Sequence, residues 1–134
     1  MNRIDQKFKK LQRKRQKAFI AFLTAGDPSL QTTEELVLAF DQVGVDIVEL
    51  GVPFSDPLAD GPTIQASSQR ALKKGVTLHK ILNTVKRIRQ KSDIPLALMS
   101  YYNPIFYQGE DRLVSKAKKD GDDGLIVQDI PLED

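Results

Sequence analysis

The sequence predicts an α/β fold with a parallel sheet, and two observations support this prediction. Short apolar runs of strand length alternate along the chain with longer stretches in which apolar residues recur every three or four positions. The short runs are apolar at consecutive positions, which is typical of strands that are buried on both faces. Connections of helical length between such strands place the strands parallel to one another in one sheet.

Composition favours a single soluble globular unit with a hydrophobic core. Of the 134 residues, 40% are hydrophobic, and the longest apolar run, Ala18–Leu23, is far shorter than the roughly 20 residues that span a membrane. No signal-peptide apolar segment follows Met1, so a cytoplasmic location is the default expectation. Cysteine is absent and His79 is the only histidine, so we expect no disulfide, thiol nucleophile or metal site.

The first 17 residues carry a strong positive charge. They hold eight Lys or Arg against one Asp, while the rest of the chain holds twelve basic and seventeen acidic side chains. Basic segments of this kind occur in nucleic-acid-binding arms. However, Ile4, Phe8 and Leu11 stand at i, i+4 and i+7, which favours an amphipathic helix that docks an apolar stripe and exposes its charges. We therefore predict a docking helix within residues 1–17 and no nucleic-acid partner.

A first strand and a first crossover helix are expected next. Residues 18–25 form an apolar run of strand length that is followed by Gly26. Thr32 and Glu35 have the spacing of a capping box, so a helix is predicted to begin there and to stop at Gly44. Its core-facing stripe is expected to comprise Leu36, Ala39, Phe40 and Val43.

The second strand, 45–50, and the loop that follows it carry two acids. Glu49 lies inside the apolar strand, one residue before its end, and Asp60 lies on a loop, 51–62, that is rich in Pro and Gly. A carboxylate inside an apolar strand costs several kcal/mol if it is left unpaired. Such a residue usually has a charged partner or a chemical task, so this stretch is where a site is expected.

The remaining residues continue the alternation of helix and strand. The predicted elements are helices at 63–75 and 77–91, a strand at 95–101, a loop at 102–107, a helix ending near Gly121 and a strand at 124–129. His79 falls among the polar positions of its helix and is expected to be exposed.

Two parallel-sheet architectures fit this order. A doubly wound sheet of four or five strands would suit 134 residues, whereas a (β/α)8 TIM barrel needs about 250. The fourth strand has no helix after it, and an independent domain should not stop with a strand that exposes apolar surface. We therefore expect residues 1–134 to be the N-terminal half of one TIM-barrel domain, with strands 1–4 and their helices in 18–134.

In either architecture, functional groups gather at the carboxyl ends of the strands. Phe22, Glu49, Tyr101 and Gln128 lie at or near these ends. The pattern therefore predicts that one rim of the sheet collects acids and aromatic side chains.

Four blocks of the sequence resemble the α subunit of tryptophan synthase. The block Glu49–Gln65 (ELGVPFSDPLADGPTIQ) is similar to the signature segment of that family almost residue for residue. The blocks Phe22–Pro28, Tyr101–Phe106 and Asp129–Glu133 are similar to the ends of the family's first, third and fourth strands. They occur in the family's order and spacing, and they cover only the first half of the family's barrel.

The resemblance implies a lyase that cleaves indole-3-glycerol phosphate into indole and glyceraldehyde 3-phosphate by a retro-aldol step. Glu49 matches the family's general acid/base, and Asp60 matches the carboxylate that stabilises positive charge at the indole nitrogen. The indole passes to a β subunit in an α2β2 heterotetramer. The pyridoxal phosphate belongs to that partner, so no cofactor is expected on this chain.

The resemblance also assigns binding residues. Those that match the family's indole pocket are Phe22, Tyr101, Ile126 and Gln128, and those that match its loop for the β subunit are Pro53, Phe54 and Asp56. Barrels that bind sugar phosphates usually hold the phosphate on loops after strands seven and eight, which lie outside this sequence. Little activity is therefore expected from these residues alone, because positioning and water exclusion contribute much of the rate.

Two other interpretations stay open. A half-barrel could associate through its open sheet edges and act as a non-catalytic structural module. A related indole-glycerol-phosphate enzyme with different chemistry is disfavoured, because no lysine stands at the expected strand ends. The length of the gene product separates the structural module from the enzyme, since a complete barrel needs about 250 residues.

Overall fold

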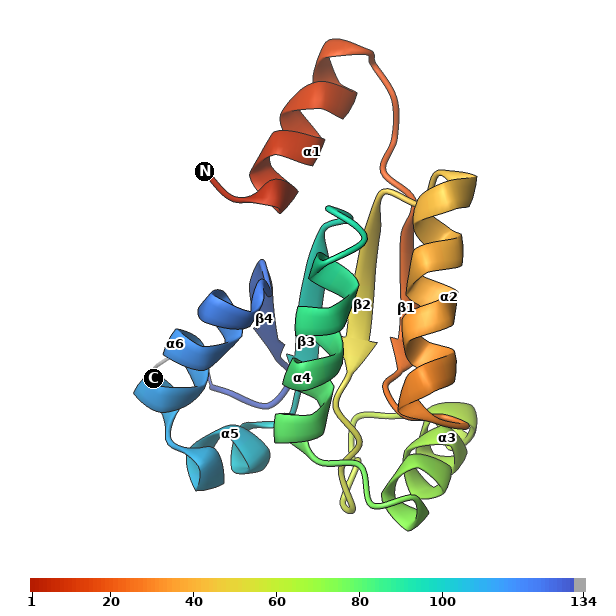
Figure 1. The fold of residues 1–134 in the computed structure, drawn as a ribbon. Coiled ribbons are helices and arrows are strands. Elements are labelled where there is room, and N and C mark those ends of the chain that lie inside the picture. Colours follow the sequence, from red (N-terminus) through yellow and green to blue (C-terminus); the bar gives the residue numbers. More distant parts are fainter. Residues whose placement is uncertain (132–134) are drawn as a thin grey trace.

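The computed structural model describes residues 1–131 and contains one parallel sheet of four strands. The strands are β1 (Ile20–Thr24), β2 (Ile47–Gly51), β3 (Leu96–Ser100) and β4 (Gly124–Val127), in the order β1-β2-β3-β4 (Figure 1). A doubly wound sheet reverses its strand order at a switch point, whereas these four strands follow their sequence order. This order is that of half a (β/α)8 barrel, which confirms the predicted fold class.

Six helices flank the strands in the described residues. They are α1 (Arg3–Arg13), α2 (Leu30–Val43), α3 (Pro62–Lys73), α4 (Leu78–Arg89), α5 (Tyr102–Gln108) and α6 (Glu110–Asp120). Figure 1 shows α2, α4 and α6 side by side on one face of the sheet, while α3 and α5 lie near the carboxyl ends of the strands. The sheet is thus covered on one face by helices of this chain.

The hydrophobic core lies between the sheet and the row of α2, α4 and α6. Alternate positions of β2 and β3 send fully buried side chains into it, and the helices meet them with aliphatic residues. The fully buried members include Val48, Leu50, Leu96, Leu98, Val37, Ile81, Val85 and Ile88. Burying each such side chain is favourable by about 1.5–3 kcal/mol, so this layer fixes the strands relative to one another.

The opposite face of the sheet stays open in the described residues. Partners in a parallel register project to the same face, and Phe22 is in register with Glu49, while Ile126 is in register with Met99. Phe22 and Ile126 are each 37% exposed, although both are large and apolar. In a (β/α)8 barrel this face is the interior, so these side chains mark where the missing strands of a barrel would pack.

Helix α2 begins earlier than predicted and turns a different stripe toward the sheet. Its N-cap is Ser29, whose Oγ accepts the main-chain N–H of Thr32 at 3.1 Å. The buried residues are Thr33 and Val37, whereas Val43 is 78% exposed. The predicted stripe is therefore wrong at Leu36, Ala39 and Val43. The helix has two apolar stripes. The sheet covers the stripe that contains Val37, whereas Leu36 and Val43 of the predicted stripe are exposed.

Residues 102–108 form helix α5 instead of the predicted loop. Pro104 is the third helical residue, where a missing N–H leaves no intrahelical bond unmade. The first N–H of the helix, that of Tyr102, donates to Oδ1 of Asp129 at 2.7 Å. Asp129 follows β4, so the cap comes from a segment 27 residues away and the local sequence pattern does not reveal it.

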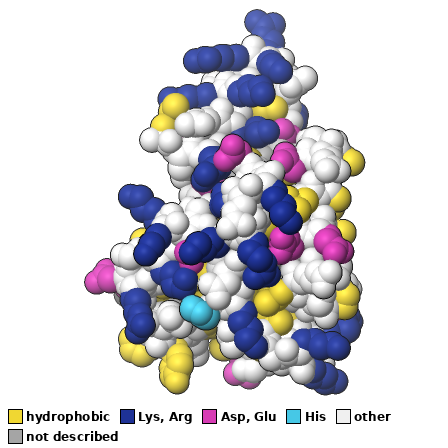
Figure 2. Space-filling model, viewed as in Figure 1, with side chains coloured by type: hydrophobic (Ala, Val, Ile, Leu, Met, Phe, Trp, Pro, Cys, Tyr) yellow, Lys and Arg dark blue, Asp and Glu magenta, His cyan; other side chains and the backbone are white. Residues whose placement is uncertain are grey.

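Helix α1 docks against the amino ends of the strands. Leu11 is buried and Ile4 is half-buried, but Phe8, the third member of the predicted stripe, is 46% exposed. Phe8 lines an open cleft together with the connection from Arg15 to Ala18. This connection covers the Phe8 ring only in part. Lys and Arg side chains are spread over the outer surface of α1 (Figure 2), as expected for a docked amphipathic helix.

A buried ion pair joins α4 to the start of β4. Arg89 Nη2 lies 2.8 Å from Asp123 Oδ2, and the two side chains are only 9% and 3% exposed. Asp123 also pairs with Arg3 of α1 at 3.1 Å and accepts the main-chain N–H of Leu96 at 3.0 Å. One carboxylate therefore ties α1, α4, β3 and β4 together at the amino ends of the strands.

His79 is exposed on α4, as predicted, and is the single histidine in Figure 2. Among residues 1–131, no helix is both long enough and apolar enough to cross a membrane.

Candidate active site

Glu49 lies in the middle of β2 on the open face of the sheet. Its register partners are Phe22 on β1 and Ala97 on β3, so an aromatic ring and a methyl group flank the carboxylate. Glu49 is half-buried, and no side chain of residues 1–131 forms an ion pair or hydrogen bond with it. A structural salt bridge therefore does not explain this acid within the described residues, which leaves it available for chemistry.

The ring of Phe22 lies over Gly51, at the carboxyl end of β2. A Cβ atom built at Gly51 would meet Cζ of Phe22 at 2.6 Å and Cε2 at 2.9 Å. Only glycine allows this approach, and the ring fills the space beside the end of the strand. Phe22 and Glu49 thus form one wall of the open face, and the indole-pocket role of Phe22 stays a prediction.

Asp60 lies on the loop after β2, at the carboxyl end of the sheet, and Tyr101 supports that loop. The hydroxyl of Tyr101 accepts the main-chain N–H of Ala59 at 2.9 Å, and its ring packs against Phe54 with centroids 5.2 Å apart. Burial and the nearby Asp60 carboxylate raise the pKa of the Tyr101 phenol. The predicted pocket residue Tyr101 therefore also holds the predicted catalytic loop.

The three residues expected to contact a β subunit differ in accessibility. Pro53 is buried, Phe54 is half-buried against Tyr101, and Asp56 is exposed. Leu58, on the same loop, is 94% exposed, which makes the tip of the loop a small apolar surface beside Asp56. The tip is thus accessible to a partner, while its base packs on the site.

Ile126 and Gln128 extend the site toward β4. Ile126 is in register with Met99. This pair lies on the open face, two residues further along the strands than the pair of Glu49 and Ala97. Gln128 follows the strand, is half-buried, and its main-chain N–H donates to the carbonyl of Ser100 at 3.1 Å. The structure therefore brings Phe22, Glu49 and Ile126 to one face, with Asp60, Tyr101 and Gln128 at its carboxyl end.

Two contributors to this site are not indicated by the sequence reasoning. Met99 of β3 lies on the open face, between Gly51 of β2 and Ile126 of β4. The alternation of side chains along the third strand could have indicated this position. Gln65 donates from its side-chain amide to the carbonyl of Asp60 at 2.8 Å. A Gln shortly after an acid carries no signal of its own, because only the folded loop reveals the contact.

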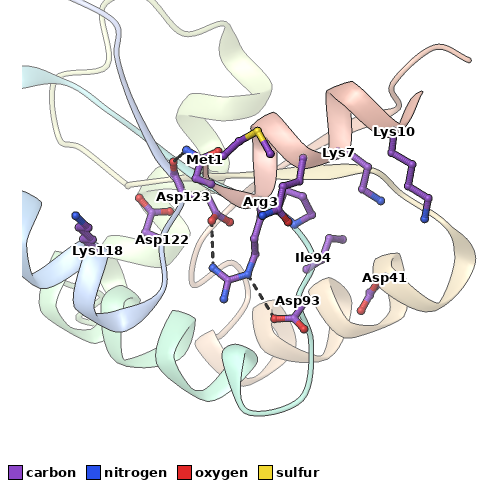
Figure 3. A pocket seen from close by; sticks show the side chains of 13 residues that line it. Met1, Arg3, Lys7, Lys10, Asp41, Asp93, Ile94, Lys118, Asp122 and Asp123 are labelled. Carbon is purple, nitrogen blue, oxygen red and sulfur yellow. Dashed lines mark hydrogen bonds and ion pairs between the residues drawn. The ribbon is translucent and has the colours of Figure 1, made fainter. Parts of the chain in front are cut away.

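A cavity of about 750 Å³ lies at the other end of the strands, beneath α1 (Figure 3). Figure 3 shows Arg3 pointing from α1 toward Asp93 and Asp123, with Asp122 beside them. Burial, and then the charge of Asp123, raises the pKa of Asp122 to about 8. Barrel chemistry takes place at the carboxyl ends of the strands, so we assign this region to stability.

The described residues offer no obvious metal site. Within residues 1–131, no group of three or more His, Asp or Glu side chains is arranged to hold a metal ion.

Four parallel strands in sequence order, with an acid on the open face and another on the loop that follows the same strand, give this chain the architecture of half a (β/α)8 barrel. The chain belongs to the tryptophan synthase alpha chain family, whose model matches residues 8–134. The curated chain of Thermoanaerobacter pseudethanolicus is 58% identical over 134 residues, and that of Geotalea daltonii is 56% identical. In both comparisons all of this chain aligns with 51% of the relative, so the chain spans about half the length of these relatives.

Solved structures support the same assignment. The tryptophan synthase α subunit of Legionella pneumophila superposes with a TM-score of 0.97 and 41% identity, over 99% of this chain and 51% of that one. An α subunit from Pyrococcus furiosus gives a TM-score of 0.83 at 46% identity, over 87% of this chain and 47% of that one. The predicted family and the half-barrel are both confirmed.

Proposed function

We propose that this chain supplies the acid–base half of an active site that cleaves indole-3-glycerol phosphate into indole and glyceraldehyde 3-phosphate. The observation that carries the proposal is the unpaired Glu49 on the open face, in register with Phe22, with Asp60 on the loop that follows the same strand. Membership of the tryptophan synthase alpha chain family gives the substrate class and supports assignment to tryptophan biosynthesis as a lyase.

The proposed reaction needs one proton donor and one proton acceptor and no oxidant. A proton from Glu49 adds to C3 of the indole ring, which gives a cation centred on the ring nitrogen. Cleavage of the bond between C3 and the glycerol carbon returns its electron pair to the ring and regenerates indole. The hydroxyl on that glycerol carbon loses its proton and becomes the aldehyde carbonyl, so Glu49 can act as acid and then as base.

Asp60 has a different task in this scheme. A fixed carboxylate near the ring nitrogen stabilises the cation more than the neutral substrate, and only such differential stabilisation lowers the barrier. Phe22, Tyr101, Ile126 and Gln128 would surround the indole. The aromatic and aliphatic members exclude water from the ring, which strengthens the attraction between the cation and Asp60.

The proposed partner is a tryptophan synthase β subunit in an α2β2 assembly, which takes up the indole and carries the pyridoxal phosphate. The exposed tip of the 53–60 loop, with Asp56 beside Leu58, supports a contact there. Pro53 and Phe54 would connect that contact to Tyr101, because Phe54 packs on its ring. No cofactor is proposed for this chain.

The decisive experiment measures indole release from indole-3-glycerol phosphate by a chain of full family length that contains these 134 residues, with and without a β subunit. Glu49→Gln and Asp60→Asn should each reduce kcat by roughly a hundredfold or more, in line with the loss of a general acid or of a charge stabiliser. Glu35→Gln, on the exposed surface of α2, is the matched control and should change nothing. Unchanged indole release by Glu49→Gln would rule out the assignment.

A second candidate, a structural half-barrel module, is favoured by the exposed apolar side chains at both edges of the sheet. Ile20 on β1 and Leu125 on β4 are 44% and 37% exposed. Edge strands of this kind pair readily with other strands. Light scattering on the 134-residue chain distinguishes a monomer from an assembly, and a gene product of about 134 residues together with a discrete dimer would favour this candidate over the enzyme.

A further inference from the structure

The main chain at Ala59 and Asp60 is held by side chains from two other elements, although the loop around it is mostly exposed. Ser55, Asp56 and Leu58 are exposed, as is Ala59 itself. The Tyr101 hydroxyl, next to the end of β3, accepts the N–H of Ala59 at 2.9 Å. From α3, the side-chain amide of Gln65 donates to the carbonyl of Asp60 at 2.8 Å. Two consecutive residues of an exposed loop are therefore held by side chains from two different elements.

Gln65 is well placed to act as a rigid support. Its main-chain N–H donates to the carbonyl of Gly61 at 3.0 Å, in the first turn of α3, and its side chain is half-buried. Gly61 is the N-cap of α3 and provides no side-chain cap. The amide of Gln65 therefore reaches back past the start of the helix to the residue before the cap. A side chain anchored on a helix holds its target with less freedom than one on a loop.

The main chain of Asp60 is held on both sides of the residue. The Asp60 N–H donates to the carbonyl of Pro57 at 3.0 Å, and the Asp60 carbonyl accepts from Gln65. The carboxylate lies near the Tyr101 phenol, whose pKa it helps to raise. The direction of the carboxylate therefore follows from the orientation of the two peptide groups of Asp60, together with its interaction with the Tyr101 hydroxyl.

We propose that Gln65 is a positioning residue that fixes the Asp60 peptide and so aims its carboxylate at the ring nitrogen of the substrate. The inference rests on the proposed function, in which Asp60 stabilises the cationic ring. Electrostatic stabilisation depends on fixed geometry, and a displacement of about 1 Å can cost as much as a hundredfold in rate.

The first test uses the 134-residue chain and needs no catalysis. Gln65→Met keeps the length of the side chain and removes the donor, and Gln69→Met, on the exposed side of the same helix, is the matched control. Loss of the hydrogen bond should accelerate hydrogen exchange at the amides of Ala59 and Asp60 by roughly five- to tenfold. The amides of β2 and of the middle of α3 should not change. Equal exchange rates in the two variants would overturn the proposal.

A third variant separates the hydrogen bond from packing. Gln65→Glu has the same shape as Gln, but an ionised carboxylate cannot donate to the Asp60 carbonyl and repels it. This variant should therefore loosen the loop at neutral pH at least as much as Gln65→Met. A role in packing alone would leave Gln65→Glu close to the parent protein, which would contradict the proposal.

The second test uses a chain of full family length that contains these residues. Gln65→Met should lower kcat and kcat/KM equally, by on the order of tenfold, while KM stays unchanged, because the lost interaction acts in the transition state. Gln69→Met should match the parent enzyme. If the parent chain releases no indole, the proposed function fails, whereas the exchange test still decides whether Gln65 holds the loop. If exchange accelerates but kcat does not fall, the loop support is real and the positioning role is wrong.

Discussion

Asp129 accepts a hydrogen bond from the main-chain N–H of Tyr102 at 2.7 Å, so the second residue after β4 caps the helix that follows β3. Removing this acceptor should destabilise α5 by about 1 kcal/mol, as for other N-cap losses. Hydrogen exchange of the α5 amides in Asp129→Ala should therefore be several-fold faster than in the parent. Asp129→Asn keeps an acceptor oxygen and should lose less. If Ala and Asn behave alike, the cap does not depend on this bond.

Asp122 should make the free energy of unfolding depend on pH. Its pKa is raised from 3.8 to about 8, so the folded state binds its proton more tightly than the unfolded state. The stabilisation from this proton is complete below about pH 4 and is lost as pH rises through about 8. Asp122→Asn should therefore match the parent near pH 4 and exceed its stability at pH 9 by about 1–3 kcal/mol.

Urea unfolding at pH 4 and pH 9 measures this difference for Asp122→Asn. The exposed Asp111 on α6 offers a control, because Asp111→Asn removes the same charge from the surface of the neighbouring helix. The parent and Asp111→Asn should lose stability together between the two pH values. An equal loss in Asp122→Asn would mean that the proton on Asp122 makes no contribution.

Breaking the Arg89–Asp123 pair should be far more damaging than breaking a surface pair. Asp123→Ala leaves the guanidinium of Arg89 buried without its partner, which costs about 3–5 kcal/mol. Asp93 also pairs with Arg3, at 3.4 Å, but its side chain is 92% exposed, so Asp93→Ala should have little effect. Denaturant unfolding of both variants checks the comparison. Comparable losses in the free energy of unfolding would show that the buried pair contributes no more to stability than the surface pair.

Gly51→Ala should displace the ring of Phe22. The added methyl would lie 2.6 Å from Cζ of the ring, and overpacking of this kind costs about 1–3 kcal/mol. Phe22→Leu in the same chain should recover most of the loss, because it removes the atoms that clash. Gly61→Ala offers a comparison without a clash, since a Cβ there meets nothing within 4 Å, and it should cost only the loss of a favourable N-cap residue, on the order of 1 kcal/mol or less. Absence of recovery in the double variant would place the strain elsewhere.

The strand order and the rim of the site could be predicted because both follow from local patterns. Buried parallel strands have continuous apolar runs, and their carboxyl ends meet at one edge, so the sequence predicts that Glu49 and Phe22 lie together, as they do. The buried face of α2 could not be predicted, since the helix has two apolar stripes and only the folded sheet selects Thr33 and Val37.

The contacts that shape the site were also beyond local patterns. The cap from Asp129 to Tyr102 joins residues 27 positions apart, and the support from Tyr101 to Ala59 joins residues 42 positions apart. Such pairs depend on how loops meet above the sheet. A single sequence shows which residues could form hydrogen bonds, but it does not show which of them the fold brings together.

The anchoring of α1 affects the order in which the chain can reach its final structure. Asn2 donates to the carbonyl of Asp123, and Arg3 pairs with the side chain of the same residue, across separations of 121 and 120 positions. During synthesis the first helix leaves the ribosome long before its anchor exists, so it must wait undocked or make other contacts. Closing so long a loop is slow compared with forming local helices. We therefore expect α1 to dock only after β4 has joined the sheet.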